Sequence, residues 1–140
     1  MIRGAYWSAV TAWHARHERT LPWWPAERLA ALQDRRVRAI VAHAYATVPH
    51  YRDAMDARGL RPSGVESDAD LAKLPLVHGA ELSAAPDRFL SSAFARRDTL
   101  ELSTTGTTGH YKRIHHDPNA VFAALAAGGR IRSAAASMTP

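Results

Sequence analysis

Glycine and threonine residues gather in one short stretch of this sequence, which runs from Ser103 to Lys112 and reads STTGTTGHYK. Glycine allows sharp backbone turns that bring successive amide N–H groups to bear on an anion. The four threonine hydroxyls add hydrogen-bond donors, and the lysine adds a mobile positive charge suited to phosphate oxygens. The stretch therefore predicts a phosphate-binding loop. An ordinary flexible hairpin turn with threonines that favour strands is the alternative reading of the same composition.

Other patterns of reactive residue types are weaker. The Walker A spacing GxxxxGK(S/T) is absent, and no helix is expected directly after the loop. The chain has no cysteine, which excludes disulfides and thiol-ligated metal sites. His14, His17 and Glu18 lie close in sequence, but a third metal ligand at suitable spacing is missing, so we predict no metal site. His115 and His116 are neighbours on an expected strand and should point to opposite faces. No catalytic residue is identified.

Helices are expected to dominate the segment before the loop. The longest should run from about residue 26 to residue 46, because apolar residues recur there at the spacing of one helical face. Shorter helices are expected over residues 4–17, over residues 50–58 with Gly59 as a left-handed cap, and around residues 80–84. Ser67 three residues before Asp70 resembles a capping box and predicts another short helix.

The pattern changes near residue 99. Residues 99–104 alternate apolar and polar side chains, which predicts a half-buried strand, and residues 111–115 form a second, weaker strand. Asp117 and Pro118 then favour the start of a helix over about 119–136. The expected fold class is α+β. A helical segment (1–98) precedes a hairpin (99–116) and a C-terminal helix (117–140). Because two strands alone are marginal in water, we expect the chain to be an incomplete portion of a larger domain.

The core from Thr104 to Gly109 resembles the phosphate-loop signature (S/T)(S/T)G(S/T)TGxPK of the adenylate-forming acyl-CoA synthetase superfamily. Upstream, residues 38–52 contain AYATVPHYR and resemble the N-terminal helix of phenylacetate–CoA ligase-like proteins, which carry a similar AYxxVPxYR run. Gly59-Leu60 and residues 70–77 follow in the same order and at similar spacing. The resemblance thus extends from about Leu29 to Asp117. It departs from the signature at Tyr111, where proline is usual, so the exit of the loop should be less rigid.

This resemblance implies an incomplete part of the large N-terminal domain of an ATP-dependent, AMP-forming acid–CoA ligase. In that family a carboxylate attacks the α-phosphorus of ATP to give an acyl-adenylate and pyrophosphate, and a thiol, commonly coenzyme A, then displaces AMP. The loop would hold the β- and γ-phosphates while Mg²⁺ offsets their charge. The family's adenine, ribose and catalytic lysine motifs lie downstream of the loop and are not located here, so we expect no adenylation by this chain alone. The residues that the resemblance assigns to ATP binding are Thr104, Thr105, Gly106, Thr107, Thr108, Gly109 and Lys112.

Bulk properties bound the remaining possibilities. The hydrophobic fraction of 46% and the charged fraction of 22% are those of a globular protein. The net charge of +5 comes from arginines spread along the chain without interleaved stacking aromatics, so we expect no nucleic-acid partner. No signal peptide or membrane span is apparent, and the protein is expected to be soluble and cytoplasmic.

A second hypothesis is a stand-alone helical module that derives from such a ligase, binds a partner protein and performs no chemistry. Four tryptophans crowd the N-terminal segment, which suits core packing or docking against a further polypeptide. The intact Gly/Thr core favours the ligase hypothesis. Self-association or docking to the rest of the enzyme is expected in either case. The identity of the acid is not readable from the sequence.

Overall fold

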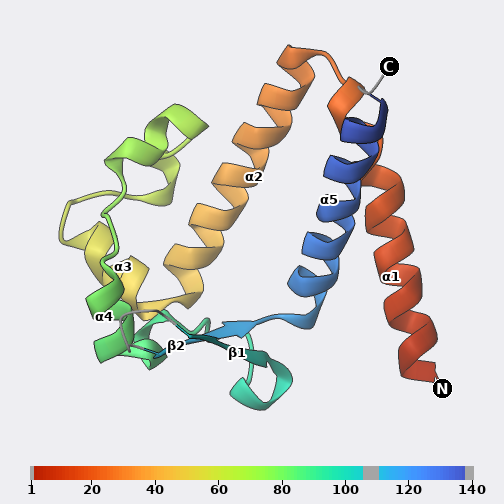
Figure 1. The fold of residues 1–140 in the computed structure, drawn as a ribbon. Coiled ribbons are helices and arrows are strands. Elements are labelled where there is room, and N and C mark those ends of the chain that lie inside the picture. The colour runs from red at the N-terminus through yellow and green to blue at the C-terminus, as the bar shows by residue number, and fades with distance from the viewer. Residues whose placement is uncertain (1, 106–110, 138–140) are drawn as a thin grey trace. The chain divides into compact units, whose positions relative to one another are not determined.

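The computed structural model describes residues 2–105 and 111–137, and it is mostly helical with one two-stranded antiparallel sheet. The α+β class expected from the sequence is therefore confirmed at this level. The chain divides into two compact units (Figure 1). One comprises residues 1–29 and 116–140, and the other comprises residues 30–115. The functional division at 98/99 and 116/117 stays a prediction.

The first unit is built on two long helices, α1 (Ile2–Glu18) and α5 (Pro118–Ser137), which pack against each other. A 3₁₀ turn at Leu21–Trp23 follows α1 and buries Leu21. The start of α5 follows the predicted chemistry, because the Asp117 carboxylate accepts a hydrogen bond from the Asn119 amide at 3.1 Å. Trp13 and Trp23 are each 67% exposed, so core packing is wrong for these two tryptophans.

The second unit is organised by α2 (Ala26–Thr47), which matches the longest predicted helix within one residue at its C-terminal end. Pro49 occupies the first turn of α3 (Pro49–Asp56), where its missing N–H and fixed φ cost nothing. Val41 on α2, Met55 on α3 and Val65 form the buried core, with Val65 fully buried. The core is completed by partly buried side chains from the same unit, namely Val37, Tyr45, Leu60 and Leu74.

Gly59 closes α3 through a Schellman motif. Its φ is +63°, the left-handed conformation predicted for this position. The Leu60 amide donates to the Met55 carbonyl at 2.9 Å, and the Gly59 amide donates to the Asp56 carbonyl at 2.9 Å. These two bonds satisfy carbonyls that the end of the helix would otherwise leave unpaired.

Asp70 caps the next turn, a 3₁₀ helix over Asp68–Lys73. Its carboxylate accepts hydrogen bonds from the Glu66 and Ser67 amides at 2.9 and 3.0 Å and from the Ser67 hydroxyl at 3.1 Å. Lys73 Nζ lies 2.6 Å from Asp70 Oδ1. Lys73 and these hydrogen bonds hold the pKa of the Asp70 carboxyl well below its usual range. The predicted capping box is confirmed.

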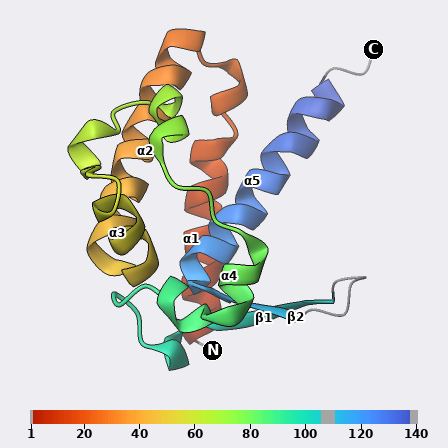
Figure 2. The same cartoon turned by 90° about the vertical axis from the view of Figure 1, so that its left-hand side faces the viewer.

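The rest of this unit is short elements that lead to the sheet. α4 (Gly79–Ala84) and a 3₁₀ helix (Pro86–Phe89) precede a further 3₁₀ turn (Arg96–Asp98). β1 (Leu100–Thr105) and β2 (Tyr111–His116) then form the hairpin (Figure 2). Within residues 2–105 and 111–137, no helix combines the length and apolar character that crossing a bilayer requires.

One expectation for β1 is wrong. The alternating sequence predicted a half-buried strand, but Leu100 is 45% exposed and Leu102 is 51% exposed. Glu101 and Ser103, on the other side of the strand, are exposed as well. Alternation marks a face that suits burial, but a covering layer must exist before burial occurs.

Candidate phosphate-binding hairpin and neighbouring sites

The structure describes three of the predicted phosphate-binding residues, and all three belong to the strands of the hairpin. Thr104 and Thr105 are the last residues of β1, and Lys112 is the second residue of β2. The two strands expected on either side of the predicted loop are thus present. Gly106, Thr107, Thr108 and Gly109 lie outside the described residues. Phosphate binding by this stretch stays a prediction.

The base of the hairpin carries a polar cluster that sequence reasoning missed. The Thr99 hydroxyl and His115 Nδ1 are 3.0 Å apart, and Glu101 Oε2 lies 3.7 Å from His115 Nε2. The His115 side chain is only 9% exposed, while the Glu101 side chain is 44% exposed. His115 Nε2 is buried and has no hydrogen-bond partner among the described residues. The His115 imidazole therefore lies between Thr99 and Glu101, which both come from the strand side opposite β2.

The observed strand bounds explain this pairing, whereas the bounds predicted from the sequence would pair residue 101 with residue 114. Two six-residue strands joined by a five-residue connection place residue 101 opposite residue 115 when their inner ends are paired. The sequence analysis considered His115 only together with His116. Cross-strand pairing gives His115 a different neighbour, Glu101, with which it shares a face of the sheet.

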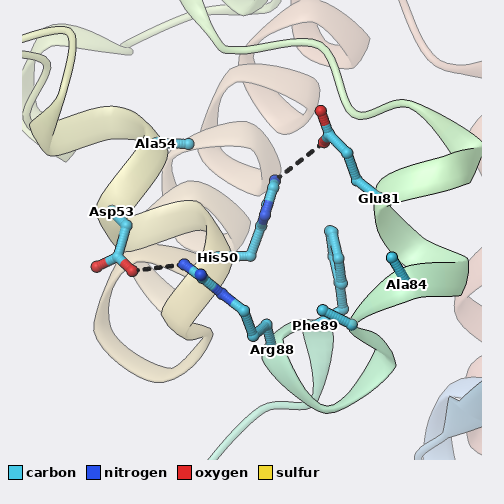
Figure 3. A pocket seen from close by; sticks show the side chains of 8 residues that line it. His50, Asp53, Ala54, Glu81, Ala84, Arg88 and Phe89 are labelled. Atoms are coloured by element: carbon cyan, nitrogen blue, oxygen red, sulfur yellow. Dashed lines mark hydrogen bonds and ion pairs between the residues drawn. The ribbon is translucent and has the colours of Figure 1, made fainter.

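A separate pocket of about 470 Å³ lies between α3, α4 and the 3₁₀ helix that follows α4 (Figure 3). The Arg88 guanidinium contacts the Asp53 carboxylate at 2.7 Å, and His50 Nε2 lies 4.0 Å from Glu81 Oε2. The His50 ring stacks on Phe89 with 4.1 Å between centroids. These contacts tie α3 to the segment 79–89.

Most charges in this pocket are already matched, which limits its chemistry. Asp53 on α3 pairs with Arg88, and the Asp53 side chain is 64% exposed. His50 and Glu81 are close enough for an ion pair when the imidazole is protonated. The pocket offers no activated nucleophile among its lining residues. We therefore regard these contacts as a tertiary connection.

His43 forms a second polar cluster with two hydroxyls. Its Nε2 lies 3.3 Å from the Thr47 hydroxyl and 3.4 Å from the Ser91 hydroxyl, and these two hydroxyl oxygens are 2.9 Å apart. His43 makes these contacts although the residue as a whole is exposed. In the described part of the chain, no carboxylate orients the imidazole for attack by Ser91, so a Ser–His–Asp arrangement is not formed. Nor do three His, Asp or Glu side chains there come together as a metal site.

Comparison with known sequences shows what this chain is similar to. No family model matches the chain. Its sequence is nevertheless similar to acid–coenzyme A ligases. The predicted resemblance to phenylacetate–CoA ligase-like proteins is confirmed over about three fifths of the chain.

Three relatives carry this similarity, and each is named phenylacetate-coenzyme A ligase. The protein of Aromatoleum evansii is 41% identical over 86 residues, which are 59% of this chain. That of Thermus thermophilus is 34% identical over 88 residues, or 61% of this chain, and that of Escherichia coli is 33% identical over 86 residues, or 59%. The match covers 19% of each relative, so the chain spans about a fifth of the length of these proteins.

Proposed function

We propose that residues 99–116 are the ATP phosphate-binding element of an ATP-dependent, AMP-forming acid–CoA ligase. The observation that carries the proposal is the 33–41% identity to three phenylacetate-coenzyme A ligases. The paired strands on both sides of the loop support it, because a hairpin presents the backbone of its connection at one end. The proposed binding residues are Thr104, Thr105, Gly106, Thr107, Thr108, Gly109 and Lys112.

The proposed task of the loop is to hold the β- and γ-phosphates. Glycine positions leave backbone N–H groups free to converge on phosphate oxygens, and threonine hydroxyls add further donors. The ammonium group of Lys112 would neutralise part of the triphosphate charge, and Mg²⁺ would offset more of it. In such a ligase ATP supplies the adenylyl group that activates the carboxylic acid.

We further propose that this chain binds phosphate but does not catalyse adenylation alone. The chain spans about a fifth of the length of the relatives, and phosphate contacts without adenine and ribose contacts give weak affinity. We expect no ATP–pyrophosphate exchange by the isolated chain with phenylacetate or other acids. Robust exchange would show that these 140 residues carry a complete adenylation site.

The binding claim is tested by titrating the isolated chain with Mg-tripolyphosphate and Mg-ATP and recording ³¹P NMR. Lys112→Ala should weaken binding at least about tenfold, since a hydrogen bond to a charged group contributes about 1.5–3 kcal/mol. Arg97→Ala is the matched control. It also removes one positive charge, its side chain is 87% exposed, and it lies outside the hairpin. If both variants lost affinity to the same extent, the binding would be non-specific charge attraction, and the proposal would be contradicted.

Exposed apolar side chains favour a second candidate function, a non-catalytic interaction module. Leu76 is 82% exposed and Ile40 is 60% exposed within residues 30–115. Exposed apolar groups of this size are common at partner surfaces. The module hypothesis predicts tripolyphosphate binding that is unaffected by Lys112→Ala, or none at all. The same titration thus separates the two functions.

A further inference from the structure

The second unit contains an apolar groove of about 390 Å³ that is distinct from the hairpin. Its floor belongs to the core of the unit, since Val41 is 5% exposed and Met55 is 2% exposed. Leu71, 42% exposed, and Ile40 stand at its rim. The groove is therefore open to solvent above and supported by tightly packed side chains below. A preformed concave site of this volume is within the range of small-molecule sites, roughly 300–1,000 Å³.

The residue types that line the groove favour a neutral ligand over a charged one. Among the described residues that line the groove, none is a lysine, arginine, aspartate or glutamate. The pocket of Figure 3 differs, because Asp53, Glu81 and Arg88 line it. An anion entering the open groove would lose part of its hydration, and among the described lining residues only the imidazole of His43 could carry an opposite charge. A neutral molecule loses far less hydration free energy on entering the groove.

Aromatic groups in the groove favour a flat ring over an aliphatic chain. Tyr51 and His43 contribute rings to the lining, whereas Met55 is only 2% exposed and belongs to the packed floor. An aromatic pair adds of order 0.5–1.5 kcal/mol beyond area burial. Hydrogen-bonding distances of 3.3 and 3.4 Å to Thr47 and Ser91 restrain the imidazole of His43, which gives the groove one fixed polar edge.

We propose that this groove binds a small neutral aromatic molecule. The ring lies on Met55 and Val41, with Ile40 and Leu71 closing the rim. Neither the loop nor the ligase activity enters this inference, so it stands independently of the proposed function. It is not a surface for a charged acid.

The test uses the full chain with toluene as probe and benzoate as the charged comparison, followed by methyl-resolved NMR. Toluene should give saturable shifts of the Met55 and Val41 methyl signals, and benzoate should bind at least about tenfold more weakly. Ala44→Leu places a larger side chain in the groove and should abolish saturable shifts. Leu71→Gln, at the rim, should weaken toluene binding about fivefold, equivalent to about 1 kcal/mol. Leu76→Gln is the matched control, since Leu76 is exposed and not part of the lining, and should leave affinity unchanged.

Three outcomes would overturn the inference. Toluene shifts that stay linear with concentration, or that persist in Ala44→Leu, would show that no site exists in the groove. Binding of benzoate as tight as that of toluene would contradict the charge argument. Shifts of the same methyl signals on raising protein concentration without probe, together with a doubled mass in sedimentation, would assign the groove to a second copy of the chain.

Discussion

Replacing Gly59 by alanine tests whether backbone conformation alone can destabilise the second unit. Gly59 has φ +63°, and no heavy atom lies within 4 Å of the position that a Cβ would take. The cost is therefore conformational and not steric. A left-handed residue other than glycine costs roughly 1–2 kcal/mol, and the alanine recovers about 0.4–1 kcal/mol by restricting the unfolded chain. We expect a net loss of about 1 kcal/mol in the free energy of unfolding.

Gly128→Ala is the opposite control. Gly128 lies inside α5, and a Cβ there also meets nothing within 4 Å, but the backbone is helical. Alanine should therefore stabilise this helix by about 1 kcal/mol. Gly59→Asn should cost less than Gly59→Ala, because asparagine tolerates the left-handed region better.

The assay is urea denaturation followed by circular dichroism, with amide hydrogen exchange to assign each change to its unit. Gly59→Ala should accelerate exchange at Leu60, whose amide bonds to the Met55 carbonyl. The left-handed cost exceeds the recovery in the unfolded chain over most of these ranges, so Gly59→Ala should be less stable than the wild type. If Gly59→Ala were more stable than the wild type, the described end of α3 would be wrong, whatever Gly128→Ala did.

Three further perturbations follow from the contacts described above. Asp70→Asn should destabilise the second unit at pH 7, and this loss of stability should shrink below about pH 5. A carboxyl whose pKa is lowered in the folded state stabilises the protein above its ordinary pKa near 3.8, and this contribution is lost as the pH falls. Urea midpoints measured from pH 7 to pH 2.5 test this, and a loss that does not depend on pH would contradict it. Met55→Ala should cost roughly 2–5 kcal/mol in the same assay, because the side chain is 2% exposed, and a loss below 1 kcal/mol would deny it a core position. Thr99→Val should cost about 1–3 kcal/mol, because it leaves His115 Nδ1 unpaired and also removes the bond from the Thr99 hydroxyl to the Arg96 carbonyl. Faster amide exchange in β1 and β2 is the local readout. Unchanged exchange in both strands would contradict a stabilising role for the bond to His115.

Local sequence chemistry predicted most elements of this fold. Pro49, Gly59, Ser67 with Asp70, and Asp117 with Pro118 each restrict the backbone through neighbours within a few residues, so their effects are readable without tertiary information. Helix and strand positions followed from those residues and from hydrophobic spacing. The capping of Asp70 and the left-handed Gly59 were predicted in detail.

Contacts between distant residues were not predictable in the same way. Asp53 pairs with Arg88 across 35 positions, and His43 approaches Ser91 across 48. Nothing local marks these partners, because many arginines and serines in the chain are equally suitable by type. Likewise the exposure of Leu100 and Leu102 depends on which layers surround the sheet. The loop assignment came from resemblance, and similarity to known ligases supports its family but not its contacts.

The connections across residues 47–92 set an order of events during synthesis. The Ser92 amide donates to the Thr47 carbonyl at 2.8 Å, and Arg88 reaches Asp53. A nascent chain that has emerged only as far as Gly59 can form α2 and α3 but lacks Val65 and Leu74 of the core as well as Arg88 and Ser92. Ribosome-bound intermediates of that length should therefore be protease-sensitive, and protection should rise first when the core residues up to Leu74 leave the exit tunnel and again when residues 88–92 follow.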